Sequence, residues 1–193
     1  MKLYLLVGMP GSGKSACSEC AKEMGYPIIR MGDCVLNEAK EKGVLLDETH
    51  FSEFATRLRN ERGNDFSAYL TVDWIRENCS NDDTVFVDGC RSMREYLVFR
   101  NFLKFVNKDF KDSDIRVFAV LASKDKRYSR ISKRGRPDNG ILAEMEARDR
   151  REISWGQLAI IDFANLKITN YGDNLEEFKD TVKIFVKVDM GLL

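Results

Sequence analysis

The sequence predicts an α/β fold in which helices cover a parallel β-sheet. Short apolar runs typical of β-strands alternate with longer segments whose apolar residues recur at helical spacing. A glycine-rich motif follows the first run directly and opens the first helical segment, which is a second sign of this fold class. The predicted strands are Leu3 to Val7, Pro27 to Arg30, Thr84 to Val87, Ile115 to Leu121 and Leu166 to Thr169.

Length and composition indicate one globular domain over residues 1–193, with 44% hydrophobic and 32% charged residues. The formal net charge of +0 gives no general attraction to nucleic acid or to anionic membranes, so neither is an expected partner. The five cysteines are odd in number and lack the spacing of a disulfide framework or zinc site, which favours reduced thiols. No apolar stretch is long enough to cross a bilayer, and we expect a cytoplasmic monomer or homodimer.

The first predicted strand leads into a complete GxxxxGK[ST] motif, which is typical of a phosphate-binding loop. Its glycines let the backbone turn N–H groups toward phosphates, and the following helix presents its positive end to the same anion. We expect Lys14 to reach the β and γ phosphates of ATP and the Ser15 hydroxyl to bind Mg²⁺. The expected nucleotide-binding positions are Gly8, Met9, Pro10, Gly11, Ser12, Gly13, Lys14, Ser15 and Cys17. Cys17 also belongs to an apolar stripe with Cys20, which favours packing in the core.

Two helical segments interrupt the strand pattern, at about residues 33–80 and 124–150. We expect both to overhang the carboxyl ends of the strands, where ligands bind in open parallel sheets. The predicted core faces of the helices are Phe51, Phe54, Ala55 and Leu58; Phe66, Leu70 and Trp74; Phe99, Phe102, Leu103 and Val106; and Leu175, Phe178, Val182 and Phe185. Asp173 or Asn174 can cap the last of these helices.

Asp88 comes directly after the third predicted strand. After Ser15, it is the second candidate residue for binding Mg²⁺. The alternative is a helix cap or turn residue, which is common for an aspartate at a strand end.

A run of basic residues follows the fourth predicted strand, with Asp125 as its one acidic member. We expect the run to close over the triphosphate and to neutralise its charge. A solvated helix face or a nucleic-acid patch is the alternative, although Tyr128 is the one aromatic residue available for base stacking. The basic residues are Lys124, Lys126, Arg127, Arg130, Lys133, Arg134 and Arg136, and Arg148, Arg150 and Arg151 extend the set.

Several motifs together resemble an archaeal P-loop family of unsettled function that is related to adenylate kinase and dephospho-CoA kinase. The resemblance spans nearly the whole chain. The motifs are the phosphate loop, residues 30–33 (RMGD), 87–92 (VDGCRS), the basic run, 148–152 (RDRRE) with 154–156 (SWG), and 169–172 (TNYG).

The resemblance implies a three-layer P-loop NTPase fold with a five-stranded parallel sheet in the order 2-3-1-4-5, an acceptor-binding arm and a short lid. It implies that Arg91 grips an acceptor phosphate, that Arg130 packs on the donor base, and that Arg134 meets the donor phosphates. Asn170 and Gly172 resemble the closing segment of dephospho-CoA kinase. The implied catalytic residues are Lys14, Asp33, Arg91 and Arg134.

One position departs from the pattern of the related kinases. Adenylate kinases place an arginine three residues after the aspartate, where this chain has Leu36. Arg30, Arg57, Arg59 or Arg62 could replace it, but their spacing does not show which of them points inward.

Three functions therefore stay open at this level. The first is a nucleoside or deoxynucleoside monophosphate kinase that uses ATP and Mg²⁺. The second is a hydroxyl-directed kinase such as dephospho-CoA kinase, with Asp33 as the base. The third is a nucleotide-dependent ATPase or switch, because phosphate loops serve both kinds of protein.

Overall fold

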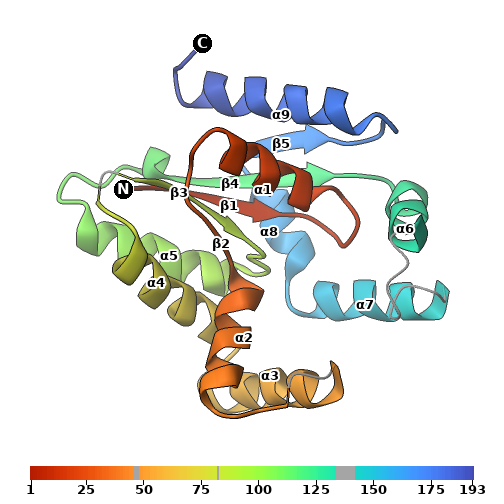
Figure 1. Ribbon diagram of the computed structural model, residues 1–193. Coiled ribbons are helices and arrows are strands. Elements are labelled where there is room, and N and C mark those ends of the chain that lie inside the picture. The colour runs from red at the N-terminus through yellow and green to blue at the C-terminus, as the bar shows by residue number, and fades with distance from the viewer. Residues whose placement is uncertain (46–47, 82, 134–141) are drawn as a thin grey trace.

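The computed structural model describes residues 1–45, 48–81, 83–133 and 142–193, and its elements are shown in Figure 1. Its sheet has five parallel strands in the order β2-β3-β1-β4-β5. This arrangement confirms the predicted fold class and the strand order that the resemblance implied. The strands are β1 (Lys2–Val7), β2 (Ile28–Arg30), β3 (Thr84–Asp88), β4 (Ile115–Leu121) and β5 (Leu166–Thr169).

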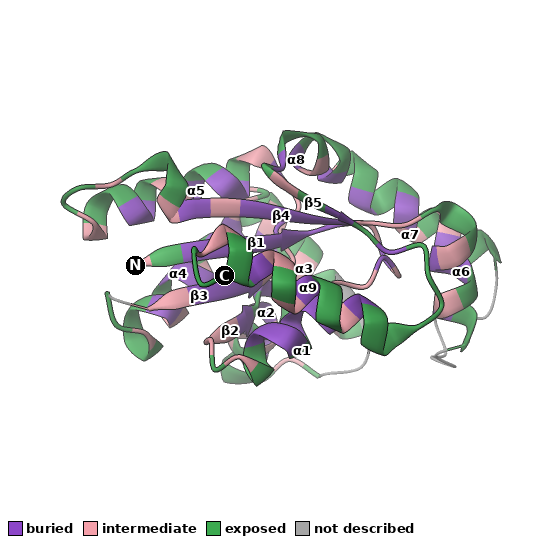
Figure 2. Cartoon of the chain, turned by 90° about the horizontal axis from the view of Figure 1, so that it is seen from above, coloured by how far each residue is buried: buried purple, intermediate pink, exposed green. Residues whose placement is uncertain are grey.

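Helices cover both faces of the sheet, as Figure 2 shows by the burial of the strands between them. Alternate residues of a strand point to opposite faces. Leu3 and Leu5 of β1 accordingly pack on one face, against α4 (Phe66–Asn78), α5 (Met93–Val106) and α8 (Gln157–Phe163). Tyr4 and Leu6 pack on the other face, against α1 (Lys14–Glu23) and α9 (Leu175–Asp189). The near-continuous apolar strands are therefore explained by burial on both sides.

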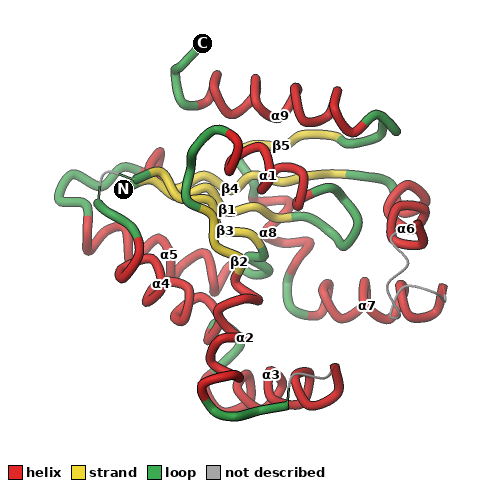
Figure 3. Tube along the Cα trace, in the orientation of Figure 1, coloured by secondary structure: helices red, strands yellow, loops and turns green. Residues whose placement is uncertain are grey.

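The predicted insertion after β2 consists of α2 (Met31–Glu41), α3 (Glu48–Arg62) and α4. Figure 3 shows α2 and α3 extending away from the sheet. They have a small apolar cluster of their own, formed by Val35, Ala39, Phe54, Leu58 and Phe66. This cluster holds the three helices together, so the side chains that they carry are fixed relative to one another.

The second insertion contains α6 (Lys124–Lys133) and α7 (Leu142–Ser154), and it lies beyond the carboxyl ends of β1 and β4 (Figure 1). Tyr128, Ile131 and Met145 form a small apolar cluster between these two helices. A 3₁₀ turn, η1 (Asp112–Asp114), precedes β4. The phosphate loop after β1 therefore lies at the carboxyl ends of the strands, between the two insertions (Figure 1).

Other predictions can be compared with the structure directly. Asn174 caps α9, because its side chain accepts hydrogen bonds from the backbone N–H groups of Glu176 and Glu177 at 3.1 and 3.3 Å. The cysteines are all free thiols. Within the described ranges, the structure contains no helix with the length and apolar character needed to cross a bilayer.

Candidate functional site

Glycines shape the loop between β1 and α1, which has conformations that other residues rarely adopt. Gly13 has a φ of 117°, and a Cβ atom at this position would lie 2.3 Å from Nδ2 of Asn170. Gly11 has a φ of 78°, and its Cβ would lie 2.7 Å from the carbonyl oxygen of Arg127. Positive φ and close backbone approach both require glycine here. The loop is therefore packed tightly between β5 and α6.

Lys14 lies inside the loop. Its Nζ donates hydrogen bonds to the carbonyl oxygens of Gly8 and, at 3.3 Å, of Met9. Burial lowers the pKa of Lys14, while the nearby carboxylates of Asp88 and Glu152 act in the opposite direction. The ammonium group thus sits in a partly desolvated position where an anion would interact with it strongly.

Asp88 ends β3 beside the loop, with a side chain that is 12% exposed. Its Oδ2 accepts a hydrogen bond from Oγ of Ser18 at 3.3 Å and lies 3.9 Å from Nε of Arg30. Among the described residues, no group of three or more His, Cys, Asp or Glu side chains could hold a metal. Mg²⁺ bound with a nucleotide needs few protein ligands and prefers oxygen, so the Ser15 hydroxyl and the Asp88 carboxylate fit it chemically.

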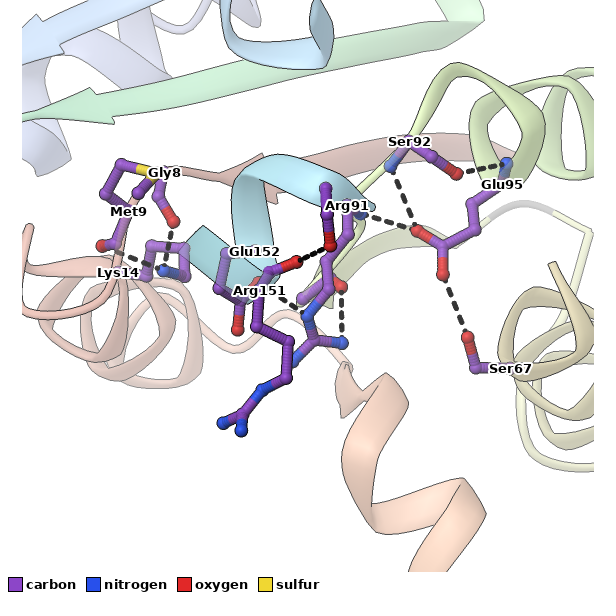
Figure 4. Close-up of polar contacts among 11 residues, drawn as sticks. Gly8, Met9, Lys14, Ser67, Arg91, Ser92, Glu95, Arg151 and Glu152 are labelled. Carbon is purple, nitrogen blue, oxygen red and sulfur yellow. Dashed lines mark hydrogen bonds and ion pairs between the residues drawn. The ribbon is translucent and has the colours of Figure 1, made fainter. Parts of the chain in front are cut away.

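Arg91 follows β3 and is tied to buried carboxylates, as Figure 4 shows. Its Nε donates to Oε2 of Glu152 at 2.8 Å, and its Nη1 donates to the carbonyl oxygen of Gly89 at 3.3 Å. Burial lowers the pKa of Arg91, but Glu152 and Glu95 outweigh it and the net direction is upward. Arg91 therefore stays charged and is held in a fixed orientation on the loop side of the sheet.

Glu95 is the second of these carboxylates and is 3% exposed. It accepts hydrogen bonds from the backbone N–H groups of Arg91 and Ser92 and, at 2.9 Å, from Oγ of Ser67. Burial raises the pKa of Glu95, against the lowering effect of these hydrogen bonds. Together with Ser92 it forms a capping box that begins α5. Glu95 thus links α4 to the segment that carries Arg91.

A cavity of about 240 Å³ lies beside the loop on the side of β5 and α9. Arg130 donates from Nη2 to the carbonyl oxygens of Asn170 and Gly172, at 3.0 and 2.8 Å. Asn170 in turn donates from Nδ2 to the carbonyl oxygen of Ser12 at 2.9 Å. The cavity is lined by Gly13, Ala16, Arg130, Lys133, Asn170, Gly172, Asp173, Asn174 and Leu175. The structure thus brings together four residues that the sequence placed at the nucleotide: Gly13, Arg130, Asn170 and Gly172.

The basic run after β4 is less unbalanced than its sequence suggests. Lys124 pairs with Glu146 at 2.7 Å, and Lys126 pairs with Asp173 at the same distance. The buried Arg127 pairs with Asp149 at 2.6 Å and also donates to the carbonyl oxygen of Pro10 at 3.0 Å. These acidic partners are distant in sequence, which explains why the local count overestimated the free positive charge. Arg134 and Arg136 lie outside the described residues.

Two further expectations concern Cys17 and Asp33. The Cys17 side chain is 1% exposed and packs in the core between the sheet and α9. This burial agrees with the packing that the apolar stripe with Cys20 favoured, and a nucleotide contact at Cys17 stays a prediction. Asp33 is exposed and lines a cavity of about 630 Å³ together with Ser18 and Arg30, both of which contact Asp88.

Sequence reasoning missed the two buried carboxylates that position Arg91. The Ser-x-x-Glu pattern at Ser92 and Glu95 is a capping-box signal and could have identified Glu95. Glu152 stands in an arginine-rich stretch, and nothing in the sequence shows that it turns inward. Neither could the sequence show that Arg59 of α3 points toward Trp155, whose ring lies 4.2 Å from the guanidinium carbon.

The sequence matches a protein-family model described as an AAA domain over residues 7–143. It is 35% identical over 183 residues to a UPF0200 protein of Methanosarcina barkeri, with 94% of this chain and 92% of the relative covered. The chain belongs to the UPF0200 family. A UPF0200 protein of Pyrococcus abyssi is 31% identical over 186 residues, covering 96% of this chain and 95% of the relative. Family membership confirms the resemblance to an archaeal P-loop family.

Solved structures show the same fold at low sequence identity. TT1252 from Thermus thermophilus has a TM-score of 0.64 and 17% identity, covering 100% of this chain and 98% of that one. A shikimate kinase from Acinetobacter baumannii, in complex with shikimate, has a TM-score of 0.57 and 12% identity, covering 99% and 94%. The UPF0200 chain therefore has a kinase-like P-loop fold.

Proposed function

We propose that this UPF0200 protein is an ATP-dependent phosphotransferase that uses Mg²⁺, and that its acceptor is a nucleoside or deoxynucleoside monophosphate. The observation that carries the proposal is that the loop has a built site on each side. The cavity at Gly13 and Arg130 lies on one side, and the Arg91–Glu152 pair lies near Lys14 on the other. A switch or simple ATPase needs only the first of these sites.

The donor side suits a nucleotide base and its phosphates. Glycine backbone N–H groups and Lys14 are available to the phosphates, while Arg130 and Asn170 form the wall of the adjoining cavity. The buried Oγ of Ser12 has no hydrogen-bond partner within the described part of the chain, so a polar ligand at the loop would satisfy it. We assign the Mg²⁺ contacts to Ser15 and Asp88.

The acceptor side favours an anionic substrate. A phosphate acceptor is already ionised near neutral pH, so its enzyme needs cationic groups that position it and neutralise its charge. Arg91 meets this need because Glu152 holds its guanidinium in place at 2.8 Å. In this proposal residues 33–80 form the acceptor arm and residues 124–150 form the lid of a single domain.

The second candidate is a hydroxyl-directed kinase such as dephospho-CoA kinase. The observation in its favour is the cavity of about 630 Å³ at Asp33, since an exposed carboxylate beside an acceptor hydroxyl can take its proton. The fold neighbour that contains shikimate is a kinase with a hydroxyl-bearing ligand, which keeps this candidate open.

The test is ATP turnover by the purified protein with Mg²⁺, measured alone and with a panel of nucleoside monophosphates, deoxynucleoside monophosphates and dephospho-CoA. We expect ADP formation that depends on a monophosphate, together with a phosphorylated product detected by mass spectrometry. ATP hydrolysis that is unchanged by every acceptor would refute both kinase candidates and favour a switch.

Variants assign the roles. We expect Lys14→Ala to abolish transfer, because the lysine contacts the phosphates in the transition state. Arg91→Ala is expected to raise the KM for the acceptor more than the KM for ATP. Asp33→Asn separates the two kinase candidates, since it should damage transfer to a hydroxyl far more than transfer to a phosphate. Equal losses with both kinds of acceptor would contradict this division.

A further inference from the structure

Trp155, at the end of α7, is surrounded by arginines from three different parts of the chain. The guanidinium carbon of Arg59 lies 4.2 Å from the centre of its ring, and those of Arg91 and Arg151 lie at 5.5 and 5.7 Å. Arg59 comes from α3, Arg91 follows β3 and Arg151 belongs to α7. The first insertion, the sheet and the second insertion therefore meet at one aromatic ring.

Arg59 packs against two aromatic rings, and its guanidinium forms no ion pair with a described carboxylate. Its guanidinium carbon lies 4.2 Å from the centre of the Trp155 ring and 5.6 Å from the centre of the Phe66 ring, so both rings pack against it. Stacking uses the face of a guanidinium, whereas its N–H donors point outward in the plane. No carboxylate of a described residue lies within 4.0 Å of Arg59 in an ion pair. Aromatic packing thus orients the Arg59 fork while its donor edge stays available.

Positive charge is in excess around Trp155. Three arginines face two carboxylates, and Glu152 is already paired with Arg91 at 2.8 Å. Burial and the charge of Arg91 lower the pKa of Arg59, while the carboxylates of Glu95 and Glu152 act in the opposite direction and the net direction is downward. Three guanidinium groups around one ring with two carboxylates, Glu95 and Glu152, leave an excess of positive charge that an anion would neutralise.

The cluster lies next to the phosphate loop. The charges of Glu152 and Arg91 shift the pKa of Lys14, and the charges of the same two residues shift the pKa of Arg59. The Arg91–Glu152 pair is therefore close enough to act electrostatically on both Lys14 and Arg59, and Figure 4 shows the pair beside Lys14. An anion at Arg59 would be on the acceptor side of the loop.

We infer that Arg59, stacked on Trp155, binds the phosphate group of the acceptor together with Arg91, and that Arg151 supplies further positive charge at the rim. This inference rests on the proposed phosphotransferase function and names the residues that would hold the phosphate of its acceptor. It also accounts for Leu36: the arginine that related kinases carry on α2 is replaced by one on α3. Trp155 is a positioning residue, because it acts through the orientation of Arg59.

The experiment uses tryptophan fluorescence of the full chain. The chain has two tryptophans, so a Trp74→Phe background leaves Trp155 as the reporter. This protein is titrated with AMP, inorganic phosphate and adenosine, with and without Mg²⁺ and a non-hydrolysable ATP analogue that occupies the donor side. We expect a saturable change with AMP and phosphate and none with adenosine. An equal response to adenosine would overturn the inference.

Arg57 provides a matched control on the same helix, because its side chain is 60% exposed and its partner is Glu61. We expect Arg59→Ala to weaken AMP binding by about tenfold or more, as for the loss of a charge-assisted contact, and Arg57→Ala to change it less than about twofold. Arg59→Lys keeps the positive charge but lacks the planar guanidinium with its paired N–H donors. Its affinity for AMP should therefore lie between those of Arg59→Ala and the parent protein. Equal affinities for Arg59→Ala and Arg57→Ala would refute the assignment.

The outcome is separable from that of the proposed function. AMP binding that depends on Arg59 in a protein without transferase activity would keep the anion site and refute the kinase. Transfer to AMP that survives Arg59→Ala with an unchanged KM would keep the kinase and refute the role of Arg59. Circular dichroism and urea unfolding of each variant show whether a weaker affinity comes from a loss of folding, and a variant that has unfolded is replaced by Arg59→Lys.

Discussion

Replacement of Asp149 by asparagine tests whether the second insertion holds the phosphate loop through a buried ion pair. Nη1 and Nη2 of Arg127 contact the two carboxylate oxygens of Asp149 at 2.9 and 2.6 Å. The side chains are only 7% and 12% exposed, and Arg127 also donates to the carbonyl oxygen of Pro10. Asp149→Asn keeps the shape of the side chain but leaves the arginine charge buried without its partner.

The expected cost follows from this burial. Loss of one partner from a buried pair costs about 3–5 kcal/mol, because the remaining charge is uncompensated. Asparagine still offers one acceptor oxygen, so we expect the lower end, about 3 kcal/mol. In a chain of this size that corresponds to a fall in Tm of roughly 6–12 °C. The Lys126–Asp173 pair is in contact at 2.7 Å, but its side chains are 37% and 80% exposed, so Asp173→Asn should cost under about 1 kcal/mol.

The assay is urea unfolding followed by circular dichroism, with Asp173→Asn as the matched control. Arg127→Met combined with Asp149→Leu removes both charges and should recover much of the loss, because no unpaired charge stays buried. Equal free energies of unfolding for Asp149→Asn and Asp173→Asn would refute the reasoning. A double variant that is less stable than Asp149→Asn would also contradict it.

Three other predictions follow from single residues. Burial raises the pKa of Glu95, so its folded form holds the proton more tightly and its contribution to stability falls as pH rises above the ordinary value of 4.5. Glu95→Gln should therefore flatten the decline in unfolding free energy above that pH, and parallel curves for the two proteins would exclude this origin. Gly13→Ala should lower ATP affinity and stability far more than Gly25→Ala. Both glycines have positive φ, but only at Gly13 would the new Cβ meet a neighbour, Nδ2 of Asn170 at 2.3 Å. Equal changes in Tm for the two variants would contradict this. Asn170→Ala removes the hydrogen bond to the Ser12 carbonyl and should weaken ATP binding in a calorimetric titration, and unchanged affinity would show that the loop keeps its shape without it.

Local sequence patterns predicted the sheet almost completely, because β1, β3 and β4 are apolar runs buried on both sides. The edge strands β2 and β5 are shorter, and each still has one buried isoleucine. The order of the strands came from resemblance, since apolar runs do not reveal their neighbours. The phosphate loop could be placed because its glycines are required by conformation and by close packing, as at Gly13. The cap at Asn174 followed from local hydrogen bonding in the same way.

The parts that sequence missed depend on contacts between distant segments. Arg127 looked like a phosphate ligand because Asp149 is 22 positions away in the chain, outside any local count of charge. Glu152 and Arg59 could not be placed at the site for the same reason. Their roles arise from the turn of α7 and the packing of α3, which no periodic pattern encodes.

The hydrogen bond from Asn170 to the Ser12 carbonyl has a consequence for how the protein matures during synthesis. The loop leaves the ribosome before Asn170, which is 158 positions further along the chain. Domains fold as units while the chain emerges from its N-terminal end. A nascent chain that stops before Asn170 thus carries the whole glycine-rich motif without the amide that holds it, so the loop gains this hydrogen bond only after β5 has been synthesised.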